Sequence, residues 1–298
     1  MFKQLSLFVL LNMLVMSISQ AEVIHQERSL YRNILVEDNN DLRCLKFNVK
    51  STKTQQSCML KSQPQKLVFN YTKLLMASLL VNPEPKRILI IGLGGGTMSN
   101  VLTELYPHSH IDNVEIDPAV IKVARDYFGF IENDNVKTYT QDGRIFIKRA
   151  LLKKESYDWI ILDAFNGDYI PEHLLTKEFL LEAKALLSEN GILSANTFSL
   201  SELYAHESAT YKDVFGHFYQ LANKVNSNRI LLVAKSDFVS EVDIEKNADQ
   251  LADKLVPYGV DIKLLHRSMM HTKFKQDWPE DTRVLTDQFS PANLLNVK

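Results

Sequence analysis

The stretch Arg87 to Asn100 reads RILIIGLGGGTMSN. It consists of an apolar run, a turn with four glycines and the start of a helical pattern. A run that is apolar throughout is typical of a parallel strand buried on both faces. Gly92, Gly94 and Gly96 follow the spacing G-x-G-x-G, whereas the dinucleotide pattern G-x-G-x-x-G would need glycine at Thr97. This spacing is usual in turns that bind S-adenosyl nucleosides. Close packing of a helix on a strand also explains a glycine-rich turn.

Strand and helix patterns alternate after this turn. Further strands are expected at His110 to Ile116, Val136 to Thr140, Trp159 to Leu162 and Ile192 to Asn196. Helices are expected between them, with Asp117, Asp142 and Thr176 at their starts. The alternation predicts an α/β fold with a doubly wound, mostly parallel, Rossmann-like sheet.

The chain divides into four predicted parts: a signal peptide at 1–21, an N-terminal β-rich region at 22–82, a Rossmann-like domain at 83–240, and a C-terminal extension of that domain at 241–298. The β-rich region includes short alternating runs such as Leu67 to Phe69, followed by a helical pattern from Tyr71 to Val81. A strand at Arg229 to Ala234 and a helix at Glu241 to Leu255 are expected. Residues 261–298 are compatible with strands or a flap.

The first residues have the features of an export signal. Lys3 is followed by the apolar run Leu5 to Ile18 and then by small residues up to Ala21. The run is short for a membrane span, so we expect export, cleavage after Ala21 and no stable membrane insertion afterwards. An uncleaved short anchor and a wrongly assigned start are the alternatives.

Export to an oxidising compartment would allow the two cysteines of the chain to form a disulfide. Cys44 and Cys58 lie at equal distances from Ser51, in two alternating segments around a polar turn. A hairpin centred on Ser51 would place them directly opposite each other, at a distance that a disulfide spans. An oxidising compartment favours that bridge, and two free thiols are the alternative.

Composition excludes some classes of protein. The formal net charge is -2, and basic and acidic residues are mixed along the chain, so nothing indicates a nucleic-acid partner. The spacing of His and Cys residues indicates no metal site.

Three acids follow predicted strands and are candidate ligand contacts. Glu115 lies 21 residues beyond Gly94, where a carboxylate can accept hydrogen bonds from both ribose hydroxyls. Asp142, with Gly143 in QDGR, can accept from an adenine amino group or cap a helix. Asp163 follows the fourth strand of the alternation and faces the same crevice, or caps its own loop.

The motifs GLGGG, VEIDP, QDGR and LDAFNGD, in this order between Arg87 and Asn196, resemble the spermidine synthase family of polyamine aminopropyltransferases. The resemblance implies a sheet of the class I S-adenosylmethionine-dependent transferase type and no permanently bound cofactor. It implies that decarboxylated S-adenosylmethionine donates an aminopropyl group to an amine such as putrescine. It further implies Asp163 as the base and self-association into a homo-oligomer. The candidate amine contacts are Asp168, the acid nearest to the family's second carboxylate, and Tyr71, although the family's upstream Tyr-His-Glu motif has no counterpart here.

The sequence departs from the family pattern at the amine end of the site. The glycine turn has Gly95 where the family has an aspartate, and Asn166 replaces a second carboxylate after the fourth strand. The family's upstream Tyr-Gln pair reads Tyr31-Arg32. These changes leave two alternatives open: a methyltransferase that uses intact S-adenosylmethionine, and a nucleoside- or polyamine-binding protein without turnover.

Overall fold

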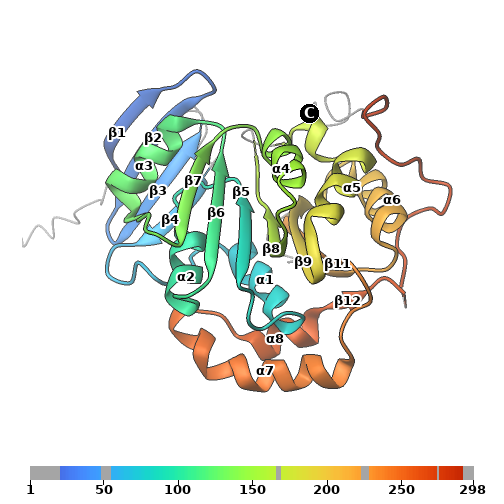
Figure 1. Cartoon of the computed structure of the whole chain (residues 1–298). Helices are drawn as coiled ribbons and strands as arrows, with labels where there is room; N and C mark the ends of the chain where they lie inside the picture. The colour runs from blue at the N-terminus through green and yellow to red at the C-terminus, as the bar shows by residue number, and fades with distance from the viewer. Residues whose placement is uncertain (1–20, 48–54, 166–168, 223–227, 274, 291–298) are drawn as a thin grey trace, which may run out of the picture.

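A mixed sheet forms the centre of the molecule (Figure 1). The structure, a computed structural model, describes residues 21–47, 55–165, 169–222, 228–273 and 275–290. Five neighbouring strands are parallel, in the order β7 (Val136–Thr140), β6 (His110–Glu115), β5 (Arg87–Ile91), β8 (Tyr157–Leu162) and β9 (Leu187–Phe198). Three antiparallel strands continue beyond β9: β11 (Asn228–Ala234), β10 (Tyr219–Ala222) and β12 (Met270–His271). The predicted doubly wound, mostly parallel sheet is confirmed.

Helices cover both faces of this sheet, which explains why its inner strands are apolar throughout. Ile88 and Ile90 of β5 pack into one core cluster, and Leu89 and Ile91 pack into the cluster on the opposite face. The first face is covered by α1 (Asn70–Leu75), η1 (Met76–Leu80), α2 (Thr97–Leu105), α7 (Glu241–Leu255) and α8 (Ile262–Ser268). The opposite face is covered by α4 (Gly143–Leu152), α5 (Lys177–Leu186) and α6 (Tyr204–Phe215).

The strand order reverses between β5 and β8. The chain runs outward from β5 to β6 and β7, and β8 then pairs with the other side of β5. In open α/β sheets, ligands bind beyond the carboxyl ends of the strands near such a point. The glycine turn after β5 and Asp163 after β8 both lie at this edge.

A second sheet of four antiparallel strands lies beside the central one. It consists of β1 (Glu22–Arg28), β2 (Asn33–Asn39), β3 (Leu42–Phe47) and β4 (Gln55–Leu60). Its apolar side chains, among them Val36 and Leu45, pack on α3 (Pro118–Phe128) through Val120 and Val123. Because α3 follows β6 directly, this contact holds the N-terminal sheet over the carboxyl ends of the central strands.

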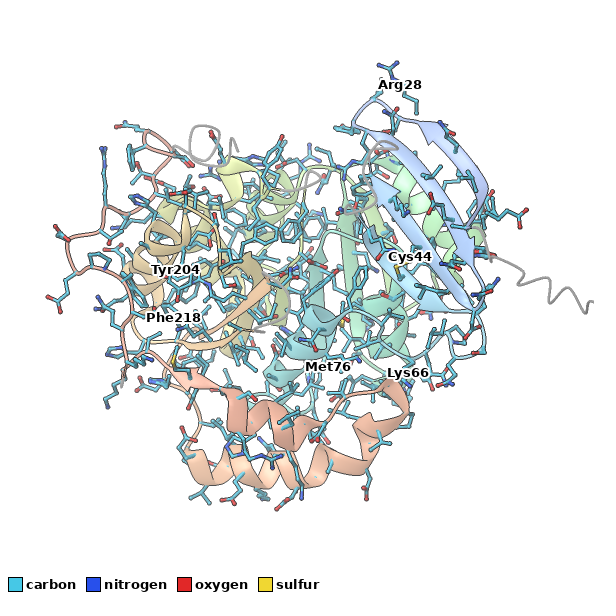
Figure 2. All side chains as sticks on the ribbon, turned by 180° about the vertical axis from the view of Figure 1, so that it is seen from behind. Arg28, Cys44, Lys66, Met76, Tyr204 and Phe218 are labelled. Atoms are coloured by element: carbon cyan, nitrogen blue, oxygen red, sulfur yellow. A yellow bond between two sulfur atoms is a disulfide. The ribbon has the colours of Figure 1, made fainter. Side chains whose placement is uncertain are left out.

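Cys44 and Cys58 are joined by a disulfide across β3 and β4, with an S–S distance of 2.04 Å. The two residues are direct partners in the strand register, which confirms the predicted opposition. Figure 2 shows Cys44 on this sheet, seen from behind. The turn around Ser51 lies outside the described residues.

Some predicted elements differ from the structure. The run Leu67 to Phe69 is irregular, because the Leu67 N–H donates to the Tyr258 carbonyl (3.0 Å) and no neighbouring strand pairs with it among the described residues. The predicted helix Tyr71 to Val81 is split into α1 and the 3₁₀ helix η1. Helix α6 was not predicted.

The C-terminal region combines a confirmed helix with a long irregular segment. Helix α7 spans Glu241–Leu255, as predicted. Within residues 261–290, the structure has α8, the two-residue strand β12 and irregular chain, so neither a set of strands nor a flap describes the part shown. The division into domains remains a prediction.

Three helix starts are confirmed by their capping bonds. Asp117 accepts from the Ala119 N–H, Asp142 from the Ile145 N–H, and Thr176 caps α5 in the same way. Within the residues that the structure describes, no helix is long and apolar enough to cross a membrane.

Candidate active site

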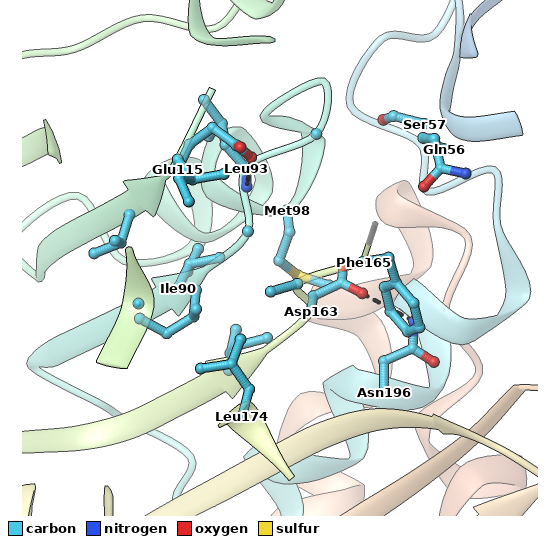
Figure 3. Close-up of a pocket in the computed structure, with 18 of the residues that line it drawn as sticks. Gln56, Ser57, Ile90, Leu93, Met98, Glu115, Asp163, Phe165, Leu174 and Asn196 are labelled. Atoms are coloured by element: carbon cyan, nitrogen blue, oxygen red, sulfur yellow. Dashed lines mark hydrogen bonds between the residues drawn. The ribbon is translucent and has the colours of Figure 1, made fainter. Parts of the chain in front are cut away.

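One large cavity lies at the carboxyl edge of the central sheet, with a volume of about 850 Å³. The central sheet contributes the turn after β5 and the residues that follow β6, β7 and β8, while the N-terminal sheet forms the opposite wall. Figure 3 shows Glu115 and Leu93 on one side, Gln56 and Ser57 on another, and Asp163 between them. A cavity enclosed by two sheets is large enough for a nucleoside together with a second small molecule.

The glycine turn approaches neighbouring atoms so closely at Gly92 and Gly96 that neither position has room for a side chain. Gly92 has φ +99°, and a Cβ there would lie 2.3 Å from the Asp163 carbonyl oxygen. Gly94, at φ +55°, also lines the cavity and packs against Ser57 of β4. Gly96 differs from both: it does not line the cavity, and a Cβ there would meet the Phe130 ring at 2.7 Å. Gly96 therefore serves close packing at the start of α2.

Glu115 is held rigidly at the end of β6. Its Oε2 accepts from the Leu93 N–H (3.1 Å) and its Oε1 from the Asp117 N–H (3.0 Å). Burial raises the pKa of this carboxyl, although these bonds and the nearby Arg32 guanidinium oppose the rise. A carboxylate has about four acceptor positions, so Glu115 can still accept from two ligand hydroxyls.

Asp142 begins α4 and also contacts the chain beyond β8. Its Oδ1 accepts from the Ile145 N–H (3.0 Å), and its Oδ2 lies 2.7 Å from His173 Nε2. The hydrogen bond to His173 lowers the pKa of Asp142. Gly143 is required by packing, because a Cβ there would lie 2.5 Å from Ile91 Cγ2. No sequence pattern indicated His173 as part of this site.

Asp163 is half-buried at the centre of the cavity. Tyr71 donates to its Oδ2 (3.1 Å) and Asn196 Nδ2 donates to its Oδ1 (2.9 Å), the bond drawn in Figure 3. Asn228 Nδ2 in turn donates to Asn196 Oδ1 (2.9 Å). Burial raises the pKa of Asp163 to about 7, although both hydrogen bonds lower it. A carboxyl with this pKa can take up and release a proton near neutral pH.

The structure unites Asp163 with Tyr71, as predicted, and adds two asparagines that sequence reasoning missed. Asn196 ends a predicted strand of the same sheet, so its position at the carboxyl edge could have been inferred. Asn228 gave no such signal, because it begins an antiparallel strand. Asp168, the other predicted amine contact, lies outside the described residues.

Arg32 closes the cavity from the side of the N-terminal sheet. Its Nη1 donates to the Phe165 carbonyl (3.2 Å), its Nε lies 3.6 Å from Asp117 Oδ2, and its guanidinium lies 4.3 Å from the centre of the Phe47 ring. These contacts place the guanidinium across the turn after β5, between the ends of β6 and β8.

Few charges line the cavity. Among the described residues they are Arg32, Glu115, Asp142 and Asp163, and the imidazole of His173 lies beside Asp142. Asp163 is therefore the only described carboxylate at the end of β8. No group of three or more potential metal ligands occurs within the part of the chain that the structure describes. The arrangement fits a nucleoside along β5 to β7 and a proton transfer at Asp163.

Comparison with known proteins agrees with this geometry. Residues 68–235 match the spermine/spermidine synthase domain. The chain is 49% identical over 281 residues to a polyamine aminopropyltransferase of Vibrio vulnificus, covering 94% of this chain and 93% of that protein. A polyamine aminopropyltransferase of Chromobacterium violaceum is 29% identical over 80% of this chain and 90% of its own length.

Solved structures show the same fold. A probable spermidine synthase from Corynebacterium glutamicum superimposes with a TM-score of 0.69 at 22% identity, covering 89% of this chain and 97% of that one. The fold, the long match to the family domain and the identity to the Vibrio protein lead to one conclusion. The chain belongs to the spermine/spermidine synthase family of transferases.

Proposed function

We propose that this protein transfers an aminopropyl group from decarboxylated S-adenosylmethionine to a polyamine such as putrescine. The observation that carries the proposal is Asp163: a half-buried carboxyl with a pKa of about 7, placed directly beside the glycine turn of a nucleoside-sized cavity. The Vibrio relative, which matches almost the whole chain, is named for the same transfer.

The nucleoside is assigned to the strand ends β5 to β7. Glu115 accepts from the ribose hydroxyls with the acceptor positions that its two backbone bonds leave free. Asp142 accepts from the adenine amino group beside Gly143. Gly92 and Gly94 let the backbone pass close to the sulfonium and its tail.

Asp163 supplies the proton chemistry of the transfer. A free alkylamine has a pKa near 10.4 and is protonated at neutral pH, so its lone pair is not available for attack. The ionised Asp163 takes a proton from this ammonium as general base. The amine nitrogen then forms a bond to the aminopropyl carbon while the C–S bond breaks. That electron pair returns to sulfur and yields methylthioadenosine.

Tyr71 and Asn196 orient the base. Each donates one hydrogen bond to a different oxygen of Asp163, which fixes the plane of the carboxylate. Both bonds also favour the ionised form and partly offset the effect of burial on its pKa. The base can thus exchange a proton near neutral pH.

The test is a product analysis of the chain from Glu22 onward. It is incubated with putrescine and either decarboxylated or intact S-adenosylmethionine, and the nucleoside product is identified by mass spectrometry. Methylthioadenosine together with spermidine is the expected result. S-adenosylhomocysteine with a methylated amine would replace the proposal by methyl transfer. Binding of nucleoside without any product would favour a non-catalytic role.

We also propose that the protein is exported and acts as a homo-oligomer. The Cys44–Cys58 disulfide supports export, because such bridges persist in oxidising compartments. Fractionation of cells that produce the full chain, with mass spectrometry of the amino terminus, should find Glu22 as the first residue outside the cytoplasm. Light scattering of the purified protein then measures its oligomeric state.

A further inference from the structure

We infer that the donor end of the cavity binds adenosyl nucleosides whose tail carries a carboxylate beside its ammonium, with Arg32 as the carboxylate contact. Intact S-adenosylmethionine and S-adenosylhomocysteine have such tails. The inference rests on the proposed function for the position of the nucleoside, but it does not depend on turnover.

The first observation is the state of the Arg32 guanidinium. Its side chain is only 11% exposed, and among the described residues its buried Nε has no hydrogen-bond partner. Nη1 donates to the carbonyl of Phe165, which is uncharged. An arginine fork matches a carboxylate because both groups are planar and can form two parallel bonds. A buried donor without an acceptor is costly, so a ligand oxygen at this point would be stabilised.

The two acids near Arg32 do not use these donors. Asp117 lies 3.6 Å from Nε, beyond hydrogen-bond distance, and it already accepts from the Ser29 hydroxyl and the Ala119 N–H. Glu115 accepts from two backbone N–H groups. The acids therefore compensate the buried positive charge but leave the hydrogen-bonding capacity of the guanidinium available.

The second observation is the neutral character of the wall around Arg32. The other cavity residues that the described N-terminal segment contributes, up to β4, are uncharged at neutral pH: Tyr31, Phe47, Gln55, Gln56 and Ser57. The turn beneath this wall has no acid, and a Cβ at Gly95 would lie 2.7 Å from Ser57 Oγ and 3.1 Å from the Phe128 ring. Neither this wall nor the glycine turn offers a carboxylate to a tail with only an ammonium, whereas a tail with both groups can pair its carboxylate with Arg32.

The position of the wall determines which ligand atoms reach it. If the ribose binds Glu115 as proposed, a 5′ substituent that reaches Asp163 must follow the turn after β5, because Glu115 contacts this turn at Leu93 and Asp163 adjoins it at Gly92. Ser57 packs on the same turn at Gly94. The guanidinium lies over the same path, between Asp117 and Phe165. The tail of the donor, rather than its adenine, is therefore the part that passes beneath Arg32. Intact S-adenosylmethionine should compete with its decarboxylated form.

Isothermal titration calorimetry with two nucleosides tests this assignment. S-adenosylhomocysteine carries the complete tail, and methylthioadenosine lacks it. We expect Arg32→Gln to weaken S-adenosylhomocysteine about 10- to 100-fold, the range typical of one bond to a charged group. Methylthioadenosine should bind this variant within about twofold of the wild-type affinity. Arg28→Gln is the matched control, because Arg28 is an exposed arginine at the rim of the same sheet (Figure 2) and does not line the cavity.

Three results would overturn the inference. An equal loss for both nucleosides would show that Arg32 contacts the ribose, and no loss for either would show that it contacts neither. Wild-type protein that binds methylthioadenosine but not S-adenosylhomocysteine would show that the cavity does not accept a tail with a carboxylate and an ammonium. If Arg32→Gln lowers the melting temperature, Arg32→Lys keeps the charge but not the fork, so it should weaken S-adenosylhomocysteine less than Arg32→Gln does while leaving methylthioadenosine unaffected. Arg32-dependent binding without aminopropyl transfer would refute the proposed function alone.

Discussion

The two halves of the cavity are built in different ways. Glu115 and Asp142 sit directly at strand ends, where one or two local backbone bonds fix each carboxylate. Around Asp163 the contacts come from Tyr71 of α1, Asn196 of β9 and, one step removed, Asn228 of β11. The nucleoside half, which contains Glu115 and Asp142, thus follows from local structure. The reacting half, which surrounds Asp163, depends on the packing of distant segments. The predictions below separate these halves.

The largest effect is expected at the base. Asp163→Asn should lower kcat by about 10²- to 10⁴-fold, the usual contribution of general base catalysis, because an amide cannot take the proton of the ammonium. Affinity for methylthioadenosine should stay unchanged, since the nucleoside contacts lie on β5 to β7. Initial rates and calorimetry measure the two quantities. Asp134→Asn, in an exposed loop, is the control; an unchanged rate in Asp163→Asn would remove this residue as the base.

The next prediction concerns Glu115, the proposed ribose contact in the nucleoside half. Glu115→Ala should weaken adenosyl ligands by about 1.5 to 3 kcal/mol, the range for hydrogen bonds to a charged group. Glu115→Gln, which keeps an acceptor for the Leu93 N–H, should lose less. Calorimetry with methylthioadenosine measures both. Wild-type affinity in the alanine variant would place the ribose elsewhere.

The N-terminal wall of the cavity depends on the disulfide. Cys58 directly follows Ser57, which packs on the glycine turn, and β4 pairs with β3 alone among the described strands. Replacing both cysteines by serine should lower the free energy of unfolding by about 3 kcal/mol, the chain-entropy value for a loop of this length. Urea denaturation with and without a reductant measures the loss. A wild-type protein whose unfolding midpoint is insensitive to reductant would contradict it.

The acid–base behaviour of the reacting half can be read from its pH dependence. Because burial raises the pKa of Asp163 to about 7, the free enzyme holds this carboxyl protonated below that pH and ionised above it. We therefore expect kcat/KM to rise about tenfold per pH unit below 7 and to level off above it. The rising limb should be absent in Asp163→Asn. A wild-type profile that is flat between pH 5 and 7 would show that Asp163 does not titrate as the base.

The same contrast explains what the sequence could reveal. Alternating strands and helices, the caps Asp117 and Asp142, and the register of Cys44 and Cys58 are all encoded within about 20 residues, and the structure confirms each. Asn228 and His173 reach the site through contacts with residues that are distant in the sequence, so no local pattern marks them. The run Leu67 to Phe69 was wrongly predicted to be a strand, because its short apolar pattern is typical of one. In the structure Leu67 packs against the C-terminal segment instead, where its N–H donates to the Tyr258 carbonyl.

The smallest effect is expected at Asn228, which is two hydrogen bonds away from Asp163. It tests whether the side chains around Asp163 act as one hydrogen-bond network. Asn228 orients Asn196, which in turn donates to Asp163. Asn228→Ala should lower kcat only a few-fold, as expected for one neutral hydrogen bond. Because the Asn196 bond lowers the pKa of Asp163, weakening it should move the rising limb of the pH profile to higher pH. Asn100→Ala removes a hydrogen bond to the Gly129 carbonyl far from Asp163 and should leave the profile in place. A lower rate without a shifted profile would mean that Asn228 supports packing alone, and that the network ends at Asn196.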